Sequence, residues 1–187
     1  MDETEVLFNG RWLRLCRRGR WEYAERTNPG GAVIVIAVTP EDKVLFVEQW
    51  REAIRAHAIE MPAGLIGDEP GEADENLIEA ARRELLEETG YRCGRLDYYM
   101  TGPSSSGMST ETIAFVRAWD LQREHAGGGV AGEDIRIHEI PRPQAAAWLC
   151  ERMAQGYSID PKVFAGLYFL EHGVALFADG ERPGLGI

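Results

Sequence analysis

The segment that most constrains this chain is residues 77–90, the main part of a predicted amphipathic helix, which carries acidic side chains where a helix disfavours them. On a helical wheel of about 100° per residue, its apolar side chains form one stripe that faces a core. That stripe consists of Leu77, Ile78, Ala81 and Leu85. Glu84, Glu87 and Glu88 lie against the edge of the stripe instead of on the far face of the helix. A fold that buries this stripe therefore brings three carboxylates toward its interior.

Two electrostatic costs coincide at the end of this helix. Glu84 and Glu88 are like charges four residues apart, and Glu87 and Glu88 occupy the last turn, where the helix dipole disfavours anions. A divalent cation held by the carboxylates would make both interactions favourable, so the pattern indicates a metal site. Helix geometry alone leaves one alternative open, which is a solvated acidic face with an Arg83–Glu87 ion pair.

Strand and helix patterns follow one another along the rest of the chain. Residues 32–38 are continuously apolar and β-branched, which is typical of a strand buried on both faces. The other predicted elements are a hairpin at 12–26, strands at 43–50, 91–100, 112–119 and 134–140, and helices at 143–155 and 161–172. Asp74 is the predicted N-cap of the central helix, and Gly90 is its C-terminal glycine. Strands and helices in this order predict an α/β layered domain.

Composition limits the classes to which the chain can belong. With 187 residues, of which 44% are hydrophobic and 27% charged, it has the size and composition of one globular domain. A net charge of −11 argues against nucleic acid as a partner, and the longest apolar run is too short to cross a membrane. The acidic amino terminus and three widely spaced cysteines predict a cytoplasmic protein without a disulfide framework.

The wording of the central helix resembles a family signature. Residues 83–91 read Arg-Glu-Leu-Leu-Glu-Glu-Thr-Gly-Tyr, which resembles the R-E-U-x-E-E-x-G-U core of the Nudix box, where U is a bulky apolar residue. The full box places G-x5-E-x7 before this core. Glu75 keeps the seven-residue spacing to Arg83, but ten residues separate it from Gly64 instead of five. Glu72 matches the local wording of many such boxes, so the first box glutamate is either Glu72 or Glu75.

The resemblance to Nudix hydrolases implies a fold, a metal and a reaction. The fold is a mixed β-sheet sandwiched between α-helices over residues 29–173, and the reaction is hydrolysis of a nucleoside diphosphate linked to another group. The resemblance implies Mg²⁺ or Mn²⁺ as cofactor, with Glu84 and Glu88 as principal ligands and Glu87 as a secondary ligand. It also implies that Arg83 orients the glutamates by ion pairing. Carboxylate oxygens are hard ligands that suit either cation.

A second set of motifs narrows the resemblance to ADP-ribose and related nucleotide-sugar pyrophosphatases. Gln49-Trp50-Arg51 and Glu60-Met61-Pro62-Ala63-Gly64 resemble the Q-x-R and E-x-P-A-G motifs of that branch. The resemblance implies that Arg51 contacts the diphosphate, that Glu60 lies in the substrate pocket, and that the carbonyl of Ala63 binds metal. Ser106 stands where a later loop of that branch usually has proline, which weakens the case for ADP-ribose in particular.

A glycine-rich loop and an aromatic hairpin complete the predicted site. The Gly-Gly-Gly-Val segment at 127–130 resembles a mobile loop that supplies a catalytic glutamate in the same enzymes, and its wording is close to that of GDP-mannose hydrolases. Glu133 is the candidate general base, and Asp134 is the alternative. By the same resemblance, residues 1–28 form an N-terminal β-hairpin module that joins two subunits of a homodimer. Trp21 or Tyr23 of that module is expected to contact the base.

Together these features predict a Mg²⁺- or Mn²⁺-dependent pyrophosphatase that acts on a nucleotide sugar and carries a C-terminal tail at residues 174–187. The leading substrate is ADP-ribose, which would be cleaved to AMP and ribose 5-phosphate. The alternatives are GDP-mannose and a broad range of nucleotide sugars. A different class of protein, a Nudix-like domain that senses ADP-ribose without cleaving it, would lack catalysis. The intact set of three glutamates in the box core argues against that class.

Overall fold

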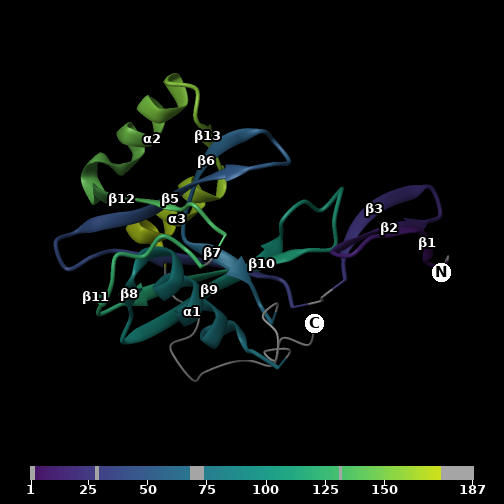
Figure 1. Cartoon of the computed structure of the whole chain (residues 1–187), viewed down its shortest axis with the longest axis horizontal. Coiled ribbons are helices and arrows are strands. Elements are labelled where there is room, and N and C mark those ends of the chain that lie inside the picture. The colour runs from purple at the N-terminus through teal and green to yellow at the C-terminus, as the bar shows by residue number, and fades with distance from the viewer. Residues whose placement is uncertain (1–2, 28–29, 68–73, 131, 174–187) are drawn as a thin grey trace.

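Two four-stranded mixed sheets form the body of the computed structural model, which describes residues 3–27, 30–67, 74–130 and 132–173 (Figure 1). The strand order in the first sheet is β7 (Ala63–Leu65), β4 (Ala32–Ala37), β10 (Thr112–Trp119) and β9 (Arg95–Pro103). The order in the second sheet is β12 (Arg136–Pro141), β5 (Lys43–Arg51), β6 (Ala56–Glu60) and β13 (Ser158–Ile159). The pairs β4–β10 and β6–β13 are parallel, and the other neighbours in these sheets are antiparallel.

Alternation along β4 explains how the first sheet is covered on both faces. Val33 and Val35 are fully buried in a core that they share with α1 (Leu77–Thr89). Ile34 and Ile36 point to the opposite face, into a second core with α2 (Ala145–Ala154) and α3 (Lys162–His172). The strand predicted to be buried on both faces is therefore confirmed, as is the α/β class with helices on either side.

The single sheet expected from the sequence is in fact two sheets. Strand β5 pairs with β6 and β12, whereas it meets the end of β4 through an isolated bridge between Val38 and Val44. In Figure 1, β5, β6 and β12 lie above β7, β9 and β10. Residues of both sheets line the polar pocket described below.

Helix α1 ends as predicted but begins later. Asn76, and not Asp74, is its N-cap, since the Asn76 side chain accepts hydrogen bonds from the amides of Ile78 and Glu79. The Glu79 carboxylate accepts one from the Asn76 amide in return, which completes a capping box. Gly90 closes the helix in the left-handed conformation, with φ of 74°, as expected.

The N-terminal module is a three-stranded antiparallel sheet and not a simple hairpin. Strand β1 (Glu5–Asn9) adds to the predicted pair β2 (Leu13–Arg18) and β3 (Trp21–Arg26). The module projects from one side of the body and contacts it through the loop at 104–111 (Figure 1). Its large apolar side chains are exposed, and they include Phe8, Trp12, Leu13 and Trp21.

Several other elements differ from the prediction. The strand predicted at 91–100 is two strands, β8 (Tyr91–Arg92) and β9, because the Gly94 amide turns to donate to the Trp119 carbonyl oxygen. Strand β8 pairs with β11 (Gln122–Arg123), and a 3₁₀ turn at Arg142–Gln144 precedes α2. No helix in the described ranges is long and apolar enough to span a membrane. The tail at 174–187 lies outside the described residues.

Candidate functional site

A polar pocket of about 440 Å³ lies where α1, β5, β6, β7 and the N-terminal module meet. This volume is in the usual range for small-molecule sites. Its acidic lining residues are Glu60, Glu84, Glu88, Glu111, Glu133 and Asp160. Its basic lining residues are Arg26, Arg51 and Lys162. The pocket thus brings together the predicted residues Arg51, Glu60, Ala63, Glu84, Glu88 and Glu133, which come from five separate segments of the chain.

Glu84 and Glu88 lie one helical turn apart on the buried side of α1. The Ala63 amide donates to Glu88 Oε2 at 3.0 Å. Burial raises the pKa of Glu88 well above its usual value, and the nearby charges of Glu84 and Glu133 raise it further. Position 64 has no room for a side chain, because a Cβ there would lie 1.8 Å from Glu84 Oε1. The backbone of β7 therefore packs directly on the two carboxylates.

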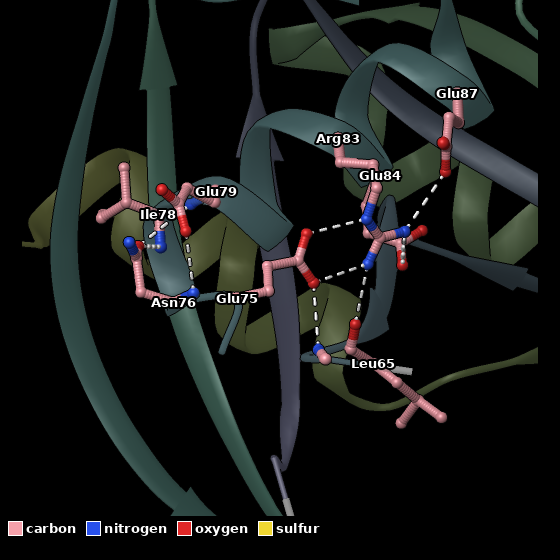
Figure 2. Close-up of polar contacts among 9 residues, drawn as sticks. Leu65, Glu75, Asn76, Ile78, Glu79, Arg83, Glu84 and Glu87 are labelled. Carbon is pink, nitrogen blue, oxygen red and sulfur yellow. Dashed lines mark hydrogen bonds and ion pairs between the residues drawn. The ribbon is translucent and has the colours of Figure 1, made fainter. Parts of the chain in front are cut away.

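Arg83 connects this helix to its surroundings through polar contacts, several of which Figure 2 shows. Its Nε donates to Glu75 Oε1 at 2.8 Å, and its Nη1 donates to Glu84 Oε1 at 2.9 Å. Its Nη2 donates to the Leu65 carbonyl oxygen at 3.0 Å, while Glu87 Oε2 lies 3.3 Å from Nη1. The Arg83 guanidinium lowers the pKa of Glu75, and the pKa of Arg83 is raised in turn.

Of the three box glutamates expected to lean toward the core, Glu87 is the least buried. Its side chain is half-exposed and is not among the lining residues of the pocket, although it retains the predicted ion pair with Arg83. The contacts of Glu75 favour it as the first box glutamate. Its carboxylate accepts hydrogen bonds from Arg83 Nε and from the Gly67 amide, the latter at 3.0 Å. The alternative, Glu72, lies outside the described residues.

Each basic residue of the pocket wall is paired with a neighbouring acid. Arg51 donates to Glu60 Oε2 from Nε at 2.9 Å and from Nη2 at 2.5 Å. Arg26 pairs with Glu111, and Lys162 with Asp160 at 2.5 Å. No site role was expected for Arg26, Glu111, Lys162 or Asp160, because β3, the loop before β10 and the start of α3 reach the pocket only through tertiary packing.

Side chains alternate along β5 between the pocket and the opposite face of its sheet. Gln49 and Arg51 line the pocket. Glu48, between Val47 and Gln49, is 3% exposed and accepts hydrogen bonds from His138 Nε2 at 2.8 Å and from Arg136 Nη1 at 3.1 Å. The two faces of this strand thus present different charges.

The loop after β11 places Glu133 and not Asp134 at the pocket. Glu133 is a lining residue, and its Oε2 accepts a hydrogen bond from the Val130 amide at 3.0 Å. Asp134 is exposed and is not among the lining residues. Of the two candidate bases, Glu133 is therefore the one whose side chain faces the buried glutamates.

Trp21 and Tyr23 are not brought to this pocket within one chain. Both line a second pocket of about 440 Å³, between the N-terminal module and residues 106–110. Trp21 is 61% exposed there. Within one chain, Trp21 therefore does not line the pocket of Arg51, and its expected base contact, which the resemblance places in a dimer, stays a prediction.

The donor set fits a hard divalent cation. Among the described residues, no three Asp, Glu, His or Cys side chains already stand in a metal-binding arrangement. Glu84 and Glu88 nevertheless supply buried carboxylate oxygens one turn apart, and Glu133 faces the same pocket. Burial, and to a smaller degree the charges of Glu84 and Glu133, raise the pKa of Glu88, and a bound Mg²⁺ or Mn²⁺ would favour the charged carboxylate.

The chain is similar to a known family, to two bacterial proteins and to a solved structure. A family model described as "NUDIX domain" matches residues 28–148. A GDP-mannose pyrophosphatase of Citrobacter koseri is 35% identical over 140 residues, which are 71% of this chain and 69% of that protein. A methanol dehydrogenase activator of Bacillus methanolicus is 32% identical over 157 residues, 80% of this chain and 82% of that one. A crystal structure of an "ADP compounds hydrolase" shares the fold, with a TM-score of 0.67 at 19% identity over 90% of each chain.

Proposed function

This chain belongs to the NUDIX domain family, and from that premise we propose that it hydrolyses the diphosphate bond of a nucleoside diphosphate sugar. The observation that carries the proposal is the division of charge in one pocket. Buried carboxylates of Glu84 and Glu88 form one side, and the guanidinium groups of Arg26 and Arg51 lie on the walls. A diphosphate needs both, since cations bind its oxygens and the carboxylates hold the metal that its hydrolysis requires.

Each of three residues has a separate role in the proposed reaction. Arg51 holds the diphosphate, exchanging part of its pairing with Glu60 for the substrate oxygens. Glu133 accepts a proton from the attacking water as the water oxygen bonds to phosphorus. The bridging P–O bond then breaks, giving a nucleoside monophosphate and a sugar phosphate. Arg83 keeps Glu84 in place.

Mg²⁺ or Mn²⁺ would be held by Glu84 and Glu88, with the Ala63 carbonyl as a further ligand and Glu87 in a secondary role. When bound, such a cation neutralises the diphosphate and lowers the pKa of an attacking water. The intact pair of buried carboxylates supports catalysis over a purely sensing role, because a sensor has no need for a costly acidic pair.

ADP-ribose is the proposed substrate, with AMP and ribose 5-phosphate as products. The motifs around Arg51 and Glu60 support it. GDP-mannose is the second candidate, because the relatives include a GDP-mannose pyrophosphatase at 35% identity and because Ser106 departs from the ADP-ribose pattern. Both substrates present the same diphosphate to the pocket.

We propose in addition a cytoplasmic homodimer, built from an N-terminal module at 1–28 and a catalytic domain at 29–173. The exposed apolar side chains of the module, among them Phe8 and Trp12, support a role in subunit contact. In a dimer, Trp21 could reach the pocket of the other subunit, which would reconcile its place in a single chain with the expected base contact.

A panel of nucleotide sugars tests the function. ADP-ribose, GDP-mannose, UDP-glucose and a nucleoside triphosphate are incubated with the protein and Mg²⁺ or Mn²⁺, and released phosphate is measured after phosphatase treatment. We expect turnover of a nucleotide sugar, with ADP-ribose fastest. Binding of ADP-ribose without turnover of any compound would indicate the sensor, and a preference for the triphosphate would contradict the proposed substrate class.

A further inference from the structure

Gly127, Gly128 and Gly129, here called the glycine strap, lie against the carboxyl end of α1. The Gly128 amide donates to the Glu88 carbonyl oxygen at 2.8 Å, and the Gly129 amide donates to the Glu87 carbonyl oxygen at 3.0 Å. Carbonyl groups of the last helical turn have no partner within the helix. The strap therefore supplies the hydrogen-bond donors for the turn that bears the buried acids.

Two positions of the strap leave no room for a side chain. All three glycines have positive φ, of 73°, 110° and 84° in chain order. A Cβ at Gly127 would lie 2.7 Å from the Glu88 carbonyl oxygen, whereas one at Gly128 would meet nothing closer than 3.8 Å. A Cβ at Gly129 would lie 2.5 Å from Glu133 Oε2. The strap thus touches the backbone of Glu88 on one side and the carboxylate of Glu133 on the other.

Glu133 is fastened to the residue that follows the strap. The Val130 amide donates to Glu133 Oε2 at 3.0 Å, and the Glu133 amide donates to the Val130 carbonyl oxygen at 3.0 Å. These reciprocal bonds hold the carboxylate against Gly129. An unbroken set of contacts consequently leads from the Glu88 backbone through the strap to the Glu133 side chain.

We propose that the glycine strap is a positioning element that fixes Glu133 relative to Glu84 and Glu88. This inference rests on the proposed function, in which Glu133 is the base. Because the strap is hydrogen-bonded to the helical turn that carries Glu88, the position of Glu133 is fixed relative to the backbone that also carries the proposed metal-binding acids. A catalytic group misplaced by about 1 Å can lower the rate about a hundredfold, so a change in the strap that moves Glu133 should lower kcat.

Gly129→Ala tests the strap through kcat and KM. The new Cβ would lie 2.5 Å from Glu133 Oε2, 2.8 Å from Glu133 Cβ and 3.0 Å from Ile135 Cδ1. These contacts lie within one loop, so we expect the fold to persist and Glu133 to shift, while kcat falls by about 10- to 100-fold and KM changes little. Gly156→Ala is the matched control, since Gly156 also has positive φ (93°) but a Cβ there would meet nothing within 4 Å. Equal losses in the two variants would contradict the proposal.

A double-mutant cycle with Glu133→Gln separates positioning from general damage. If the strap acts through Glu133, Gly129→Ala adds little further loss in the Glu133→Gln background, whereas independent losses would multiply and overturn the proposal. Amide hydrogen exchange adds a readout that needs no turnover. We expect the Gly128 and Gly129 amides to be protected, and exchange at exposed-loop rates would refute the strap even if hydrolysis is confirmed. If no nucleotide sugar is hydrolysed, protected amides would leave the contact intact and only the proposed function would fail.

Discussion

The two ends of α1 carry the same residue type in opposite environments. At the amino end, Glu79 completes the capping box, and Glu75 just before the helix pairs with Arg83 (Figure 2). At the carboxyl end, Glu84 and Glu88 are buried beside each other, and the last turn contains no basic residue. Acids near a helix amino end are stabilising and those near its carboxyl end are not.

This contrast separates structural acids from functional ones without reference to any other protein. The amino-end glutamates are satisfied by partners within the chain, as the lowered pKa of Glu75 indicates. Glu88 instead has a raised pKa, which means that the chain alone does not stabilise its charge. Removing an acid should therefore cost stability at one end and activity at the other.

Glu88→Gln should give the largest effect. We expect activity to fall by about a thousandfold or more, because Glu88 is a proposed metal ligand and the metal would supply several kcal/mol of transition-state stabilisation. The metal-free variant should be at least as stable as the wild type at pH 7, because the charged form of Glu88 is disfavoured by burial. Steady-state kinetics and urea unfolding measure the two effects, with Glu151→Gln on the exposed face of α2 as control.

The same variant should change how stability depends on pH. The pKa of Glu88 is raised in the folded state, so the folded metal-free chain binds this proton more tightly than the unfolded chain does. Wild-type stability should therefore decline as pH rises from about 4 through the raised value, and the Gln variant should lack that decline. If the unfolding free energies of the two proteins depend on pH in the same way, the charge of Glu88 does not destabilise the fold.

Glu133→Gln should have the next largest effect, a fall in kcat of about 10²- to 10⁴-fold with little change in KM. The physical reason is the loss of the proposed proton acceptor, while the proposed contacts of Arg51 with the diphosphate would remain. Asp134→Asn, one residue away and outside the pocket, should leave kcat near the wild-type value. The reverse result would move the base to Asp134.

Glu75→Gln should destabilise the fold by about 2 kcal/mol, because it weakens charged hydrogen bonds to Arg83. Since the folded pKa of Glu75 is lowered, its contribution is present above the usual carboxyl pKa and is lost as pH falls through the lowered value. The difference in unfolding free energy between wild type and variant should accordingly shrink in acid. An unchanged difference would show that the pair is not charge-dependent.

Asn76→Ala should give the smallest effect, a loss of about 1 kcal/mol from the missing N-cap, with kcat unchanged. Asp74→Ala, which alters the residue first expected to cap the helix, should be close to neutral. Thermal unfolding of the two variants distinguishes them. Equal losses would mean that the capping box does not govern the start of α1.

Local patterns predicted the parts of the fold that local physics controls. The apolar run of β4, the stripe of α1 and the glycine after it are visible without tertiary information. The correct N-cap was visible too, since Asn76 and Glu79 have the spacing of a capping box. Strands β6, β7, β11 and β13 were missed because each has at most five residues and depends on a pairing partner.

The candidate site divides in the same way. Glu84 and Glu88 could be predicted because one helix places them together. Arg26, Glu111 and Lys162 could not, because β3, the loop before β10 and α3 meet at the pocket only after the sheets have formed. Trp21 was expected at the pocket by resemblance, but the module that carries it is turned toward the loop at 106–110 within one chain.

The alternation along β5 has a consequence for changes in chain length. Gln49 and Arg51 face the pocket, whereas Glu48 faces the opposite side of the sheet, where it contacts His138. Inserting or deleting one residue early in this strand would exchange the two sets, because side chains alternate with a period of two. After an insertion, Glu48 and Trp50 would face the pocket, so its wall would gain a carboxylate and lose the guanidinium of Arg51, which would disfavour the proposed diphosphate. The charge of the pocket wall therefore depends on which alternate positions of this strand face it.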